Sequence, residues 1–85
     1  AGGLKIGEPA VDLAVCLAIA SSVYDAVISE DSIACGEVGL LGELREVPFL
    51  EKRLEEAKRL GFKNFITPKN CKTLKQAIAQ TIKKG

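Results

Sequence analysis

The sequence has no histidine, methionine or tryptophan, and aromatic residues make up 5% of its 85 positions. Without histidine, it lacks the most frequent general base and the most frequent metal ligand in proteins. Cys16, Cys35 and Cys71 are widely spaced and form no C-x-x-C pair, so they predict neither a zinc site nor a disulfide framework. We therefore predict no metal in this chain, cysteines that pack in the core, and a cytoplasmic location.

The sequence also lacks long apolar runs and an excess of charge. The apolar run at positions 11–20 contains Asp12 and has about half the length needed to span a bilayer, which predicts no contact with a membrane. Twelve basic and eleven acidic side chains give a net charge of +1, so any binding to nucleic acid depends on a local patch. No phosphate-binding loop of the G-x-x-x-x-G-K-[ST] type is present, so no nucleotide cofactor is predicted here.

The first half of the chain predicts a helix followed by a hairpin. Residues 9–22 are nearly all small or aliphatic, which predicts a central helix that other elements cover on most sides. Residues 33–38 and 44–47 flank a connection with a glycine at each end, Gly39 to Gly42, which favours an antiparallel hairpin.

The second half predicts two amphipathic helices and one strand. Residues 49–60 carry apolar side chains at helical spacing, and Gly61 follows as a C-terminal cap. A short strand is expected around Phe65, and Thr73 opens a final helix that we expect to end in Lys83-Lys84-Gly85.

This order of elements predicts one α/β (α+β) domain over residues 1–85, with a mixed sheet and about three helices. Three strands are too few to cover the apolar first helix. We therefore expect the domain to be truncated at its N-terminal end. Upstream strands, or a partner chain bound by self-association, would complete the layer.

Several segments resemble the Lon proteolytic domain. The first group comprises residues 36–44 (GEVGLLGEL), 51–54 (EKRL) and 57–63 (AKRLGFK). Residues 2–14 (GGLKIGEPAVDLA) and 18–22 (AIASS) are more similar to the version of that domain in bacterial DNA repair ATPases of the RadA (Sms) family. The resemblance implies a Lon-like, two-layer fold of the ribosomal protein S5 domain 2-like type.

The resemblance also locates the two catalytic positions of Lon. Its nucleophilic serine lies in a Gly-Pro-Ser-Ala-Gly stretch that aligns with residues 8–12, which places Ala10 at the nucleophile position. Its lysine follows a triplet that aligns with residues 48–50, which places Glu51 at the lysine position. Both are vestigial dyad positions, and the resemblance implies no catalytic residue and no peptidase activity. Glu46 departs from the family pattern, where a proline is usual, and this affects the expected local turn.

For function, the resemblance implies a non-catalytic scaffold and DNA-interaction module. RadA-type proteins form hexameric rings that process branched DNA intermediates in recombination and repair. Their ATP, magnesium and zinc would be bound in other domains of the parent protein, with no cofactor in this chain.

Basic residues on and after the second helix are candidates for contacting DNA. They are Lys52, Arg53, Lys58, Arg59, Lys63, Lys69 and Lys72, with Lys75 beside them. Glu51, Glu55 and Glu56 interleave with the first of these residues, so a solvated helix face is the competing interpretation.

Two alternatives remain open. The chain could be an active Ser-Lys peptidase of the Lon family with a displaced dyad, made of Ser21 or Ser22 with Lys5 or Lys63. Short polar residues at the end of a helix are also expected for capping alone. The other alternative is an unrelated domain that shares the fold.

Overall fold

The computed structural model describes residues 9–82, which form short helices and strands in the expected order. The elements are η1 (Pro9–Val11), α1 (Asp12–Tyr24), β1 (Ser32–Ala34), β2 (Glu37–Val38), β3 (Leu44–Arg45), α2 (Leu50–Arg59), β4 (Asn64–Ile66) and α3 (Leu74–Thr81). The predicted helices and the predicted hairpin are confirmed. The predicted strand 33–38 is divided into β1 and β2, and Lys83-Lys84-Gly85 lie outside the described residues.

The strands pair in two separate sheets. β1 and β4 are parallel, with Ile33 opposite Phe65, whereas β2 and β3 are antiparallel, with Val38 opposite Leu44. The prediction of one mixed sheet was therefore wrong, although both kinds of pairing occur. The chain changes partners after β1, because the Gly36 N–H donates to the Ala10 carbonyl oxygen at 3.1 Å instead of continuing the β1–β4 ladder.

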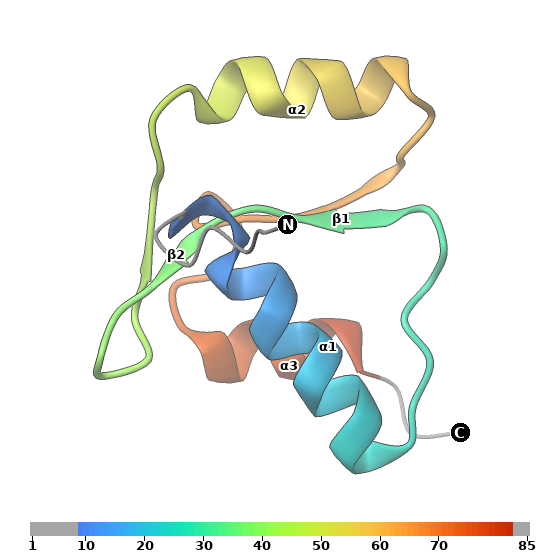
Figure 1. Ribbon diagram of the computed structural model, residues 1–85, viewed down its shortest axis with the longest axis vertical. Coiled ribbons are helices and arrows are strands. Elements are labelled where there is room, and N and C mark those ends of the chain that lie inside the picture. The colour runs from blue at the N-terminus through green and yellow to red at the C-terminus, as the bar shows by residue number, and fades with distance from the viewer. Residues whose placement is uncertain (1–8, 83–85) are drawn as a thin grey trace, which may run out of the picture.

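Helices lie on both sides of the strands. Figure 1 shows α2 on one side, and α1 and α3 together on the other. This gives three layers instead of the expected two, because α2 has its own buried stripe, in which Leu50 and Ala57 are almost fully buried. On the other side, Leu13 and Leu17 of α1 pack with Ile66 of β4 in the main core.

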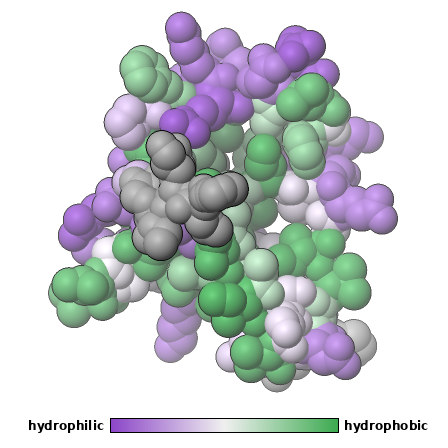
Figure 2. Space-filling view, in the orientation of Figure 1, coloured by the Kyte–Doolittle hydropathy of each residue, from purple (hydrophilic) through white to green (hydrophobic). Residues whose placement is uncertain are grey.

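α1 is covered on one face only by the described residues. Leu13, Leu17 and Ala20 are buried, whereas Val15, Ile19 and Val23 are 51%, 59% and 73% exposed. Figure 2 shows hydrophobic side chains gathered over this helix. The expectation of a helix covered on most sides was wrong for residues 9–82. The other expectation, that a small number of strands would leave the first helix partly uncovered, is confirmed.

Two helix ends follow the predicted chemistry. Gly61 has a φ of +102° and its N–H donates to the Lys58 carbonyl oxygen, as a glycine C-cap does. The Thr73 hydroxyl accepts a hydrogen bond from the Gln76 N–H at 3.1 Å at the start of α3. The Gln76 side chain accepts from the Lys72 N–H rather than from Thr73, so the capping box is displaced by one residue.

Candidate functional site

Ala10, the nucleophile position implied by the resemblance, lies in η1 and is 4% exposed. It packs with Cys35, Val47 and Leu50 in one apolar cluster. Residues just after it hold this segment in place, because the Asp12 carboxylate accepts a hydrogen bond from the Val38 N–H at 3.2 Å. A methyl group therefore occupies the position that the resemblance aligns with the Lon serine, and its surroundings are apolar.

Glu51, the implied lysine position, lies in the first turn of α2 and directly follows Leu50. The two positions implied by the resemblance are thus close to the same apolar cluster, although they are far apart in the sequence. The Glu51 side chain is exposed and forms an ion pair with Lys69, which lies in the turn after β4. At these two positions the arrangement provides neither a hydroxyl nor a free amine.

The serines of the displaced dyad lie at the end of α1. The Ser21 hydroxyl donates to the Ala26 carbonyl oxygen, and Ser22 is exposed. Lys63 is exposed just before β4, and Lys5 lies outside the described residues. The bond from Ser21 is the kind of local capping bond that short polar residues make at helix ends.

A groove of about 300 Å³ runs between α2 and the turn after β4. It is lined by Glu51, Leu54, Glu55, Lys58, Phe65, Thr67, Lys69 and Asn70. Two of the basic candidates, Lys58 and Lys69, therefore face the same groove. Glu51 and Glu55 line it too, so its formal charges balance.

The basic residues that are candidates for contacting DNA do not form one patch but lie on α2, near β4 and near the start of α3. Figure 2 shows hydrophilic side chains over α2, where Lys52, Arg53, Lys58 and Arg59 are all exposed. Arg59 is paired with Glu56 in the same helix, and this hydrogen bond raises the pKa of its guanidinium. Lys72 is exposed near the start of α3.

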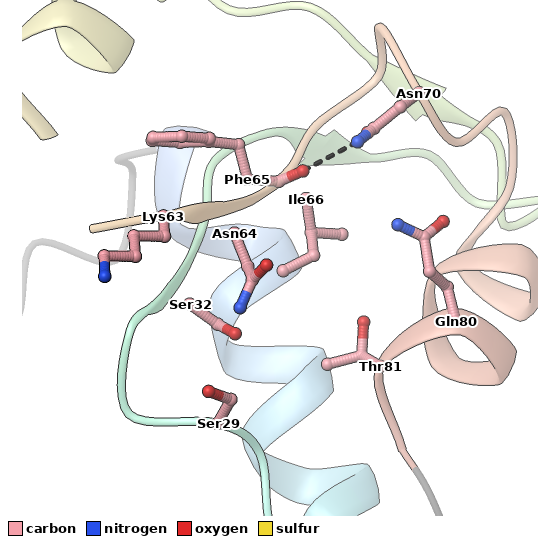
Figure 3. Close-up of a pocket in the computed structure, with 9 residues that line it drawn as sticks. All are labelled: Ser29, Ser32, Lys63, Asn64, Phe65, Ile66, Asn70, Gln80 and Thr81. Atoms are coloured by element: carbon pink, nitrogen blue, oxygen red, sulfur yellow. Dashed lines mark hydrogen bonds between the residues drawn. The ribbon is translucent and has the colours of Figure 1, made fainter. Parts of the chain in front are cut away.

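A larger pocket of about 590 Å³ lies at the other side of β4 (Figure 3). It is lined by Ser29, Ser32, Lys63, Asn64, Phe65, Ile66, Asn70, Gln80 and Thr81. Of these, the sequence singled out Lys63 as a DNA candidate and missed Asn64, Asn70, Gln80 and Thr81. No motif could have found them, because they come from three segments that meet only in the folded chain.

Asp31 organises one wall of this pocket. Its carboxylate accepts hydrogen bonds from the Ser29 hydroxyl and, at 2.9 Å, from the Asn64 side-chain amide. The bond from Ser29 lowers the pKa of Asp31 most, and the bond from Asn64 and the charge of Lys63 lower it further. The negative charge of Asp31 therefore stands close to the positive charge of Lys63.

The cysteines have packing roles. Cys35 and Cys71 are buried and Cys16 is half-buried, and burial raises the pKa of the Cys71 thiol.

Within residues 9–82 no three His, Cys, Asp or Glu side chains come together in a way that suits a metal ion. Among the same residues, no helix combines the length and the apolar character needed to cross a membrane.

Comparison with known proteins identifies the family. A family model described as subunit ChlI of Mg-chelatase matches residues 2–71, and the chain belongs to this family. Several proteins similar to this chain are called DNA repair protein RadA. The protein of Chlamydia pneumoniae is 54% identical over 67 residues, and that of Synechocystis is 46% identical over 85 residues. The protein of Aquifex aeolicus is 50% identical over 70 residues.

These matches cover 79%, 100% and 82% of this chain, respectively. They cover 15–17% of the relatives, so the chain spans only a small part of their length. The name of the relatives agrees with the RadA resemblance, whereas the Mg-chelatase description was not anticipated from the sequence. Homology to DNA repair proteins is therefore established for this chain.

Proposed function

We propose that this chain is a non-catalytic scaffold and DNA-interaction module of a RadA-type, cytoplasmic repair protein that processes branched DNA. The observation that carries the proposal is the pair of vestigial positions: the Ala10 methyl group is buried among apolar side chains, and the Glu51 carboxylate is paired with Lys69. A Ser-Lys mechanism needs a hydroxyl and a neutral amine at these positions. ATP, magnesium and zinc would belong to other parts of the parent protein.

The exposed face of α2 is the proposed contact with DNA. Lys52 and Lys58 are exposed and form no ion pair within residues 9–82, so both ammonium groups are available to phosphates. Lys69 is the weaker candidate, since Glu51 neutralises it. Phosphate contacts of this kind position a protein on DNA without reading its sequence.

The uncovered face of α1 is the proposed assembly surface. Its exposed residues follow one another at intervals of four, from Val11 to Val15, Ile19 and Val23, and therefore form one stripe. A continuous apolar stripe on a folded domain is usually covered by another element or chain. We expect it to be covered within the parent protein or its ring hexamer.

The salt dependence of binding to a labelled forked DNA tests the DNA contact. Affinity is expected to fall steeply with salt, and Lys52→Gln and Lys58→Gln should each reduce the slope of log K against log salt by about 0.9. Arg45→Gln is the matched control, because it removes the same charge from the hairpin, where Arg45 is paired with Glu43. Binding that does not change with salt would rule out a phosphate-contacting face.

Labelling with a serine-reactive fluorophosphonate tests the absence of catalysis. No labelling above that of a denatured sample is expected. Labelling that disappears in Ser21→Ala or Ser22→Ala would establish the displaced dyad instead and overturn the scaffold proposal.

A further inference from the structure

We propose that the pocket in Figure 3 holds one unpaired nucleobase of a DNA strand, with the neighbouring phosphate at Lys63. This inference rests on the proposed function. It adds a binding site for an unpaired base, separate from the face of α2 that is proposed to contact phosphates. The pocket measures about 590 Å³, which lies within the range of roughly 300–1,000 Å³ for small-molecule sites.

Part of the polar lining is already engaged by the protein. Ser29 and the amide nitrogen of Asn64 donate to Asp31. Asn70 donates to the Phe65 carbonyl oxygen at 2.7 Å, and its own oxygen accepts from the Thr67 N–H at 2.9 Å. These bonds hold the walls of the pocket in place and leave the remaining polar groups for a ligand.

Four polar groups around Ile66 have no partner among the described residues. They are the hydroxyls of Ser32 and Thr81, the amide nitrogen of Gln80 and the side-chain oxygen of Asn64. The Thr81 hydroxyl oxygen is buried and unpaired among the described residues, so it pairs with a ligand only when the side chain turns toward the pocket. Figure 3 shows these side chains arranged around Ile66, which offers an apolar surface between them.

This combination of groups suits the edge of a nucleobase. A base edge presents carbonyl oxygens, ring nitrogens and amino groups side by side, so it can accept a hydrogen bond from the free Gln80 nitrogen and donate one to the free Asn64 oxygen. Hydroxyls can donate or accept and so complete such a pattern. An unpaired base exposes this whole edge, as an enzyme-extruded or single-stranded base does.

The charges favour a neutral group inside the pocket and an anion at its rim. The Asp31 carboxylate accepts hydrogen bonds from Ser29 and Asn64 of the pocket wall and lies near Lys63, so a phosphate deep in the pocket would come close to a negative charge. In Figure 3 the Lys63 ammonium lies at the edge, away from Gln80 and Thr81. A phosphate bound there would remain in contact with solvent.

The pocket also adjoins the proposed DNA surface. Phe65 and Asn70 line both this pocket and the groove along α2. A strand that contacts Lys58 in the groove can therefore continue past Asn70 and place a base against Gln80 and Thr81. Branched DNA offers such unpaired bases at its junctions.

Fluorescence anisotropy with two labelled oligonucleotides of equal length, oligo(dT) and its abasic counterpart, tests the inference. The chain is expected to bind oligo(dT) about tenfold more tightly, a difference of about 1.4 kcal/mol. Ser32→Ala combined with Thr81→Val should reduce that preference to about twofold and leave the abasic affinity unchanged. Thr81→Val removes an unpaired buried hydroxyl, so unfolding is not expected to mask the result.

Lys52→Gln is the matched control, because it should weaken binding to both oligonucleotides equally. Equal affinity of the wild-type chain for both would overturn the base pocket and leave the DNA contact of α2 intact. A preference for oligo(dT) that survives in the double variant would place the base elsewhere and also overturn the inference. Failure to bind either oligonucleotide would instead overturn the proposed function itself.

Discussion

The carbonyl oxygen of Ala10 accepts a hydrogen bond from the Gly36 N–H at 3.1 Å, and the Leu13 N–H donates back to the Gly36 carbonyl oxygen at 3.1 Å. This pair of bonds fixes the start of α1 against the point where β1 ends and β2 begins. The Ala10 methyl group is thereby held against Cys35 and Val47, with Leu50 of α2 on the same cluster. The position that the Lon resemblance aligns with the nucleophile is therefore part of the packing between layers.

Ala10→Ser is expected to destabilise the fold and to leave it inactive. The added hydroxyl would be buried among apolar side chains, which costs about 1–3 kcal/mol when it has no partner. Urea denaturation measures this loss, and Ala18→Ser on the exposed part of α1 is the control, with a cost of about 0.5 kcal/mol. A variant as stable as the wild type that also reacts with a fluorophosphonate would contradict the vestigial assignment.

Phe49→Gly is expected to raise the free energy of unfolding by about 0.5–1 kcal/mol, the relief of backbone strain less the greater unfolded-state entropy of glycine. Phe49 precedes α2 with a φ of +62°, a left-handed conformation that costs a residue with a side chain about 1–2 kcal/mol. Its side chain is 72% exposed, so little packing is lost. Phe49→Ala keeps the strained conformation and should bring no gain. Equal stability of the two variants would show that φ at this position is not the cause.

Asp31 should contribute stability that depends on pH. Its folded pKa is lowered, chiefly by the Ser29 hydroxyl, so the contribution is present above the unfolded pKa of about 4 and is lost as pH falls through the folded pKa. The stability difference between wild type and Ser29→Ala should therefore be largest above about pH 4 and shrink below it. Denaturation at a series of pH values measures it, and a difference that grows on acidification would have the wrong sign.

Lysine at two positions of the exposed α1 stripe should reduce self-association without loss of stability. Ile19→Lys with Val23→Lys places charge on side chains that are 59% and 73% exposed, and such surface changes stay within about ±0.5 kcal/mol each. Sedimentation velocity measures the association state. Leu13→Ala, at a fully buried position, is the contrasting variant and should cost about 2–5 kcal/mol. An unchanged association state in the lysine variant would remove this face as an assembly surface.

Local chemistry in the sequence was sufficient to predict most elements. The apolar spacing of residues 49–60 and the glycine at position 61 predicted α2 and its end, and Thr73 predicted the start of α3. The arrangement of helices and strands in layers could not be predicted from these local patterns. The Gly36 N–H does not continue the β1–β4 hydrogen bonds but donates to the carbonyl oxygen of Ala10, a residue 26 positions earlier. No local sequence pattern predicts a hydrogen bond between residues so far apart.

For the candidate site too, the sequence predicts which chemical groups are present, whereas the tertiary structure determines which of them lie together. The residue types at positions 10 and 51 suffice to show that a Lon-type hydroxyl and amine are missing there, because that depends on chemical identity alone. Their closeness to one cluster, the pairing of Glu51 with Lys69, and the pocket formed by Ser32, Asn64, Gln80 and Thr81 depend on tertiary contacts. The sequence by itself determined which groups the chain carries and which helices and strands it forms, because these follow from side chains and their spacing. Only the tertiary structure decided which groups meet, because distant segments come together to bury apolar surface and to pair their backbone groups.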